Sequence, residues 1–209
     1  MTLWSRARVA WQALKTRRKM NRQFRRREDP FGYCTTPYER VRLEALEEVL
    51  GAGPLNAALE AGCAEGHFTE RLARRAAEVT GLDISAVALV RARRRVPSAA
   101  FIEGDLLSWT PPSGASYDAI VLGDVLYYLD RPGVAAEFSA LFGRIASWLA
   151  PGGRLLLAHG FSGAKELAHR RSFRERFEGA GLRLLSEGVV DGAERGGVRC
   201  ALAVLVRDV

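Results

Sequence analysis

The residues with the clearest chemical potential are a glycine turn and an acid that follows it along the chain. The turn spans Glu60–Gly66 and has glycines at positions 62 and 66, between an apolar run and a helix-forming run. Such a turn lets backbone N–H groups face a polar or anionic ligand group. Asp83 follows at the end of the next apolar run, about 20 residues on, where a carboxylate can accept both hydroxyls of a ribose. We therefore predict a site for a nucleoside-containing cofactor formed by Glu60, Gly62, Gly66 and Asp83.

The spacing of the glycines distinguishes this turn from two other nucleotide-binding loops. A dinucleotide fingerprint needs a further glycine where the chain has Ala64, and a carboxylate at Glu65 should repel a pyrophosphate. A Walker A loop needs Gly-Lys-Ser/Thr, whereas this chain has His67 after the second glycine. Both patterns, and with them an NAD-dependent oxidoreductase, are disfavoured. A turn whose glycines serve packing alone remains the alternative.

An acid two residues before the first glycine, followed by G-x-x-x-G, resembles motif I of the class I S-adenosylmethionine-dependent methyltransferases. The resemblance implies S-adenosyl-L-methionine as the cofactor, with its amino-acid end at the turn and its ribose on Asp83. It further implies that Asp105 and the Leu106 backbone meet the adenine, with Ile84 against the face of the ring. By the same resemblance, Asp124 contacts the methionine part of the cofactor or the incoming nucleophile. It covers roughly residues 37–209.

The elements that must position these residues alternate from Asn56 onward between short apolar runs and helical stretches, which is typical of a parallel sheet with helices on both faces. We expect strands at 57–61, 78–83, 99–103, 117–122, 154–158, 182–187 and 198–207. The last two are joined without a helix, so they should pair antiparallel. The predicted fold is a Rossmann-like, doubly wound, seven-stranded α/β sheet, mostly parallel, with an antiparallel hairpin at its end.

The ends of the predicted strands supply the catalytic candidates, because ligands of open α/β sheets bind at the carboxyl ends of the strands. Asp124 follows the fourth strand and His159 ends the fifth. An amine must be neutral to attack a methyl group, and a carboxylate or imidazole can orient it and take its proton. Tyr128 could hydrogen-bond the acceptor. Asp124 could instead cap a helix, Asp105 could form a turn, and His159 could serve only to satisfy backbone groups.

Three short strings narrow the resemblance to the nodulation-factor N-methyltransferase branch: residues 124–129, 38–40 and 157–159. That branch methylates an amino nitrogen on a deacetylated chitin-type oligosaccharide. Position 124 is Asp where the branch leads us to expect Glu, which places the carboxylate one methylene shorter. The implied function is methyl transfer to a small-molecule or amino-sugar acceptor, at nitrogen rather than oxygen. Methylation of DNA bases is disfavoured, because no Asn/Asp-Pro-Pro-Tyr/Phe motif follows the fourth strand.

The net charge of +7 comes from the first 27 residues, which hold ten cations and no acid, while the remaining residues hold 21 cations and 24 acids. Trp4, Ala7, Trp11 and Leu14 stand at helical spacing among these cations and predict a basic amphipathic helix. It could contact RNA, lie on an anionic membrane surface, cap its own domain or remain a solvated tail. We divide the chain into an arm and lid segment at 1–36 and a methyltransferase domain at 37–209. We expect lids over the site at 31–42 and 188–197.

The three cysteines, Cys34, Cys63 and Cys200, are far apart and form no C-x-x-C pair. This pattern indicates neither a disulfide framework nor a zinc site, so we expect no metal and a cytoplasmic location. Two further functions remain open. One is an RNA methyltransferase that uses the basic arm, and the other is a non-catalytic scaffold that only binds the cofactor.

Overall fold

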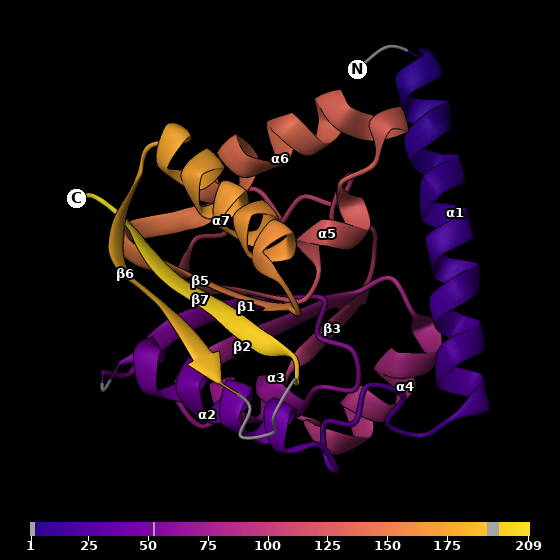
Figure 1. The fold of residues 1–209 in the computed structure, drawn as a ribbon, viewed down its shortest axis with the longest axis horizontal. Coiled ribbons are helices and arrows are strands. Elements are labelled where there is room, and N and C mark those ends of the chain that lie inside the picture. The colour runs from indigo at the N-terminus through magenta and orange to yellow at the C-terminus, as the bar shows by residue number, and fades with distance from the viewer. Residues whose placement is uncertain (1–2, 52, 192–196) are drawn as a thin grey trace.

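Seven strands form one sheet in the order β3-β2-β1-β4-β5-β7-β6 (Figure 1). The computed structural model describes residues 3–51, 53–191 and 197–209. The strands are β1 (Leu55–Ala61), β2 (Ala76–Asp83), β3 (Ala100–Glu103), β4 (Tyr117–Gly123), β5 (Leu149–Phe161), β6 (Leu182–Asp191) and β7 (Arg199–Arg207). β1 pairs in parallel with β2 and β4, whereas β7 pairs antiparallel with β5 and β6. The predicted fold class, with its antiparallel end, is confirmed.

Helices cover both faces of this sheet. They are α1 (Leu3–Arg26), α2 (Pro37–Leu50), α3 (His67–Leu72), α4 (Ala86–Arg95), α5 (Leu126–Leu129), α6 (Ala135–Trp148) and α7 (Ala164–Gly179), with a short 3₁₀ turn at Pro132–Val134. Figure 1 shows α2, α3 and α4 on one face, α6 and α7 on the other, and α1 along one margin of the molecule. None of the helices within the described ranges is both long and apolar enough to cross a membrane.

The alternation of side chains along the central strands explains the two layers of helices. Leu59 and Ile120 point into the cluster beneath α6 and α7, while their neighbours Ala58 and Val121 point into the cluster beneath α2 and α3. Because both faces of a parallel strand are buried, such strands are apolar almost throughout. The core therefore fixes the register in which the strand ends meet.

Local sequence signals set the starts of α2 and α4. Thr36 caps α2 before Pro37, and the Ser85 hydroxyl accepts the backbone N–H of Ala88 at the start of α4. The helix expected after Gly66 is shorter than predicted, because the chain enters β2 already at Ala76. α5 was not predicted, since its four residues are too few to show a helical period.

Candidate active site

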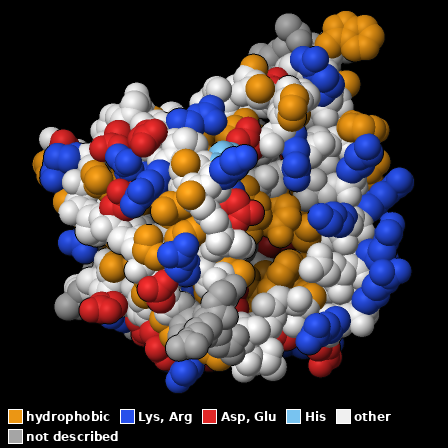
Figure 2. Space-filling view, in the orientation of Figure 1, with side chains coloured by type: hydrophobic (Ala, Val, Ile, Leu, Met, Phe, Trp, Pro, Cys, Tyr) orange, Lys and Arg blue, Asp and Glu red, His pale blue; other side chains and the backbone are white. Residues whose placement is uncertain are grey.

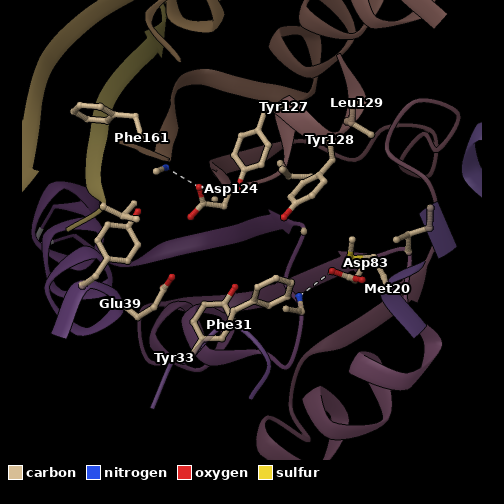
Figure 3. A pocket seen from close by; sticks show the side chains of 18 of the residues that line it. Met20, Phe31, Tyr33, Glu39, Asp83, Asp124, Tyr127, Tyr128, Leu129 and Phe161 are labelled. Carbon is tan, nitrogen blue, oxygen red and sulfur yellow. Dashed lines mark hydrogen bonds between the residues drawn. The ribbon is translucent and has the colours of Figure 1, made fainter. Parts of the chain in front are cut away.

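A cavity of about 800 Å³ lies at the carboxyl ends of the parallel strands (Figure 3). The expected site residues that line it are Gly62, Asp83, Ile84, Asp105, Leu106, Asp124 and Tyr128. Glu60, Gly66 and His159 do not line it. The opposite wall comes from α1 and from the segment between α1 and α2.

The first part of the cavity is built around Asp83 at the end of β2. Its Oδ2 accepts the backbone N–H of Ala64 in the glycine turn at 2.9 Å, and its Oδ1 accepts that of Ser85 at 2.7 Å. Burial raises the pKa of this carboxyl, against the lowering effect of the backbone N–H groups. Gly62, at φ +83, leaves no room for a side chain, because a Cβ would stand 3.0 Å from the Cβ of Val125. The turn is thus held close to an acid that lines the cavity.

Asp105 forms the neighbouring part of the cavity, after β3. Its Oδ1 accepts the backbone N–H of Leu107 at 3.2 Å, whereas its buried Oδ2 has no hydrogen-bond partner within the described residues. A buried acceptor without a donor is costly, and a ligand that supplies an N–H removes that cost. The exocyclic amine of adenine is such a donor. With Asp83 close by, these residues fit a nucleoside.

Asp124 lies at the other end of the cavity, immediately after β4. Its φ of 49° is in the left-handed region, which a non-glycine residue adopts at a cost. Oδ1 accepts the backbone N–H of Gly160 at 2.7 Å and the Tyr127 hydroxyl at 3.2 Å. Figure 3 shows the Asp124 carboxylate and the Tyr128 hydroxyl directed into the cavity. A strained backbone therefore holds a fixed carboxylate in the cavity, at the end away from Asp83 and Asp105.

The charges around Asp124 come from helices α2 and α7. The buried Arg42 guanidinium donates to Glu39 Oε2 from Nη2 at 2.6 Å, and its Nε lies 3.7 Å from Asp124 Oδ2. Burial raises the pKa of Glu39, while Arg42 opposes this shift. The Arg170 guanidinium lies 4.2 Å above the ring of Tyr127. This end of the cavity thus presents two carboxylates with two guanidinium groups beside them.

His159 lies behind the cavity, although its strand end was expected to bring it to the site. Its side chain is 1% exposed, and its ring centroid is 5.5 Å from that of Phe173 in the core. Burial lowers its pKa to about 4, so the imidazole is neutral at pH 7. The direction of the side chain explains the difference, because successive residues of β5 point to opposite faces and its neighbour Gly160 lines the cavity. The structure therefore places His159 behind the cavity wall that it was expected to join.

Glu60 and Gly66 also lie outside the cavity wall. The Thr69 hydroxyl donates to Glu60 Oε2 at 2.5 Å, so this carboxyl supports the turn from beneath. Burial raises the pKa of Glu60 to about 7. Gly66 begins α3 at φ +79, and a Cβ there would stand 3.3 Å from the Cα of Ala92. Gly66 thus serves the close packing of α3 against α4.

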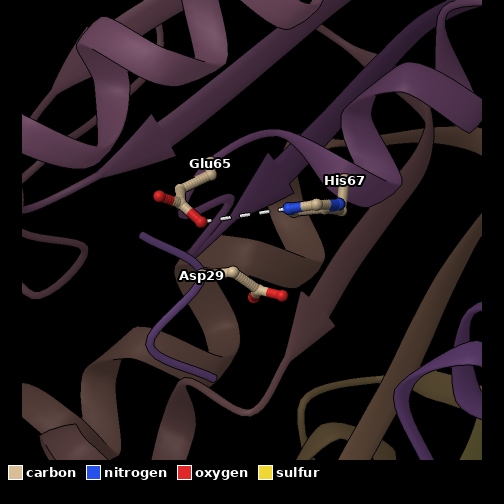
Figure 4. Close-up of side chains that lie close together, drawn as sticks. All are labelled: Asp29, Glu65 and His67. Carbon is tan, nitrogen blue, oxygen red and sulfur yellow. Dashed lines mark ion pairs between the residues drawn. The ribbon is translucent and has the colours of Figure 1, made fainter. Parts of the chain in front are cut away.

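Glu65 does not face the cavity, so it cannot repel a pyrophosphate there as expected. It is 3% exposed and paired with the Arg91 guanidinium of α4. Asp29, Glu65 and His67 offer three oxygen and nitrogen atoms within 4.8 Å of one another, the arrangement of a cation site (Figure 4). Arg95 Nη2, however, lies 3.3 Å from His67 Nε2. Guanidinium groups thus already pair with the residues of this cluster. The evidence against a dinucleotide site is now the glycine spacing alone.

The same cluster fastens the segment between α1 and α2 over the cavity. Asp29 accepts the backbone N–H groups of Tyr33 and Cys34 at 2.7 and 2.8 Å, and the Tyr33 ring stacks on His67 with centroids 4.7 Å apart. Phe31 and Tyr33 then line the cavity. The expected lid at 31–42 is therefore in place over the strand ends. Of the second expected lid, residues 192–196 lie outside the described part of the chain, and Gly197 lines the cavity.

Sequence reasoning missed the side chains that α1 contributes to the cavity. Thr16, Met20 and Phe24 line it, and Phe24 is 1% exposed. The apolar positions of the arm gave a signal, because Val9, Met20 and Phe24 lie on one side of a helix. The abundance of cations drew the interpretation toward an external partner. One face of the arm belongs to the site.

Comparison with known proteins agrees with this geometry. Residues 58–153 match the family model described as a methyltransferase domain. The structure superposes on the N-methyltransferase NodS from Bradyrhizobium japonicum WM9, solved in complex with S-adenosyl-L-homocysteine, with a TM-score of 0.78 and 25% identity. The match covers 92% of this chain and 98% of that one.

Two characterised relatives have different names. Nodulation protein S of Rhizobium tropici is 38% identical over 62% of this chain and 54% of its own length. Trans-aconitate 2-methyltransferase of Paracidovorax citrulli is 35% identical over 57% of this chain and 46% of its own length. The matched region thus spans about half the length of each of these relatives.

Proposed function

We propose that this chain, which belongs to the class I S-adenosylmethionine-dependent methyltransferases in their nodulation protein S-like branch, methylates a small-molecule amine. The methyl group is transferred to the nitrogen of that amine. S-adenosylmethionine is the cofactor of this family. When bound, it supplies a methyl group that is already activated by its sulfonium sulfur. What the protein must add is a held acceptor and a route for one proton.

We assign the cofactor-binding role to residues at three strand ends. Asp83 would accept the ribose hydroxyls, the Asp105 carboxylate and the Leu106 backbone would meet the adenine, and Ile84 would lie against the ring. The turn from Gly62 to Ala64 would face the methionine part. The free Oδ2 of Asp105 is the feature that supports this orientation.

The observation that carries the proposed reaction is the fixed carboxylate of Asp124 in the acceptor end of the cavity. Gly160 and Tyr127 hold its Oδ1. Its Oδ2 forms an ion pair with Arg42 at 3.7 Å, and we propose that this oxygen accepts an N–H from an incoming amine. In that geometry Asp124 orients the nitrogen and takes the proton that the amine loses when it gains the methyl group. The Tyr128 hydroxyl can hold a second N–H. Glu39, which is paired with Arg42, lines the same end of the cavity.

One observation favours a second function, methylation of a carboxylic acid. Arg170 lines the same end of the cavity, where its Nε donates to the Gly160 carbonyl at 3.0 Å. Its remaining N–H groups could bind a carboxylate. A relative named for trans-aconitate belongs to the same family. The acceptor is an amine if Asp124 binds it and a carboxylic acid if Arg170 binds it.

The experiment that tests the proposal is release of S-adenosylhomocysteine with four acceptor panels: amino sugars and other primary amines, neutral sugars, small carboxylic acids, and RNA. We expect turnover with amines above their pKa and none with neutral sugars. Turnover with carboxylic acids alone would establish the second function, and turnover with RNA alone an RNA methyltransferase. Cofactor binding without any release would indicate a non-catalytic scaffold. We retain the cytoplasm as the proposed location, because all three cysteines are free.

A further inference from the structure

Helix α1 has an inner face that belongs to the protein and an outer face that nothing within the described residues covers. On the inner face, Val9, Met20 and Phe24 are 3%, 8% and 1% exposed. On the outer face, Trp4 and Trp11 are 82% and 58% exposed. Large aromatic side chains left in water at neighbouring helical positions mark a surface that meets a partner.

The outer face is organised in two stripes with a spacing of seven residues. Trp4, Trp11, Arg18 and Arg25 form one stripe, and Arg8, Lys15 and Arg22 form the next. In the first stripe the two tryptophans precede the two arginines, whereas the second stripe is basic throughout. Figure 2 shows Lys and Arg side chains gathered along the margin of the molecule where α1 runs.

These cations are not neutralised by the protein itself. Of the basic residues of α1, Arg17 alone forms an ion pair with an acid in the described part of the chain, with Glu103 at 3.3 Å. Lys15 lies 3.6 Å above the ring of Trp11, and the other cations project from an element that has no acid. The surface is therefore complementary to a partner with many negative charges.

We propose that the outer face of α1 docks the protein on an anionic lipid bilayer. A straight helix of 24 residues is about 36 Å long, and all of its outer face can touch a flat surface at once. Each Lys or Arg near an anionic leaflet is attracted to the negative headgroups, and tryptophan side chains favour the headgroup level. Trp4, Trp11 and the half-exposed Leu14 then enter the interface, where they leave water.

A nucleic acid fits the same face less well. A base stacks on an open aromatic ring, but Lys15 covers one face of Trp11. The inner face of α1 is packed on the protein body, so the helix cannot enter a groove. Phosphates would neutralise the cations but would leave Trp4 and Leu14 in water. A bilayer accounts for both the charged and the apolar residues of this face. The proposed docking is independent of which acceptor the protein methylates.

The test is flotation of the full-length protein with vesicles of phosphatidylcholine that contain one quarter phosphatidylglycerol, or none. We expect at least tenfold tighter binding to the anionic vesicles, a loss of binding between 50 and 300 mM salt, and a blue shift of tryptophan emission. The double variant Arg18→Glu/Arg22→Glu should weaken binding at least thirtyfold. The control Arg74→Glu/Arg183→Glu changes charge equally on exposed residues outside α1 and should bind like the wild type.

A second variant tests the aromatic half of the face. Trp4→Ser/Trp11→Ser should abolish the blue shift, because Trp148 is buried and Trp109 lies outside α1. Three wild-type results would overturn the proposal without any variant: equal binding to neutral vesicles, no binding to anionic vesicles, or tighter binding to a 20-nucleotide RNA than to anionic vesicles. Equal losses in the α1 variant and its control would also overturn it.

Discussion

The Asp124 carboxylate accepts the backbone N–H of Gly160 at 2.7 Å, and this bond joins the end of β4 to the end of β5. The contact explains why an acid is held in the left-handed region at this point. One oxygen is fixed by the neighbouring strand, and the other is directed to the cavity with the Arg42 guanidinium 3.7 Å away. The same residue thus links the carboxyl ends of two neighbouring strands and places a carboxylate at the acceptor end of the cavity.

Replacing Asp124 by Asn should separate these two roles. Asn adopts the left-handed region readily and can still accept from Gly160, so folding should be kept. The loss of the negative charge removes the group that takes the proton, and we expect kcat to fall about 100-fold. Cofactor affinity, measured by calorimetry, should change less than threefold. A variant with unchanged kcat would show that Asp124 is structural.

Replacing Asp83 should act on the cofactor instead. Hydrogen bonds to a charged acceptor contribute about 1.5–3 kcal/mol each, so Asp83→Ala should weaken S-adenosylmethionine binding about 100-fold. Asp83→Asn keeps an acceptor for the Ala64 N–H and should lose less. Calorimetry at constant pH measures both, and Asp208→Asn, on the surface beside Arg183, is the control. Affinity within twofold of wild type in Asp83→Ala would remove the ribose assignment.

His159→Phe should leave catalysis intact and change the response to acid. The folded-state pKa of about 4 lies below the unfolded value of about 6.5, so the unfolded chain binds more protons between these values. His159 therefore lowers the free energy of unfolding by about 2 kcal/mol at pH 5 and by almost nothing at pH 7.5. Urea melts should show a smaller loss of stability at pH 5 in the variant. A large fall in kcat at pH 7.5 would restore a catalytic role.

Much of the fold could be predicted because both faces of the central strands are apolar and because α2 and α4 begin with capping residues. The apolar runs around Leu59 and Ile120 located the strands, and Ser85 located the start of α4. The strand ends then gave Asp83, Asp105 and Asp124. The sequence could not show which face of a strand a terminal residue takes, and this explains the difference at His159.

The wall opposite the strand ends was harder to predict, since it consists of contacts between segments distant in the sequence. Tyr33 reaches the cavity because Asp29 turns the backbone and His67 stacks on the ring. No local pattern indicates such a contact. The role of Glu65 was misjudged for the same reason, because its partner Arg91 lies on another helix.

Glu60→Gln should make the protein more stable at high pH. Burial raises the folded-state pKa of Glu60 to about 7, above its unfolded value of about 4.3, so the folded state binds more protons between these values and stability falls as pH rises. The charged form costs about 3 kcal/mol at pH 8, and Gln removes this cost while its carbonyl can still accept from Thr69. Urea melts at pH 5 and pH 8 should therefore converge in the variant but differ in the wild type. Because Glu60 lies beneath the turn and not in the cavity, the cofactor affinity of the variant at pH 7 should stay within about threefold of the wild-type value. If both proteins respond to pH in the same way in these urea melts, the raised pKa of Glu60 is contradicted.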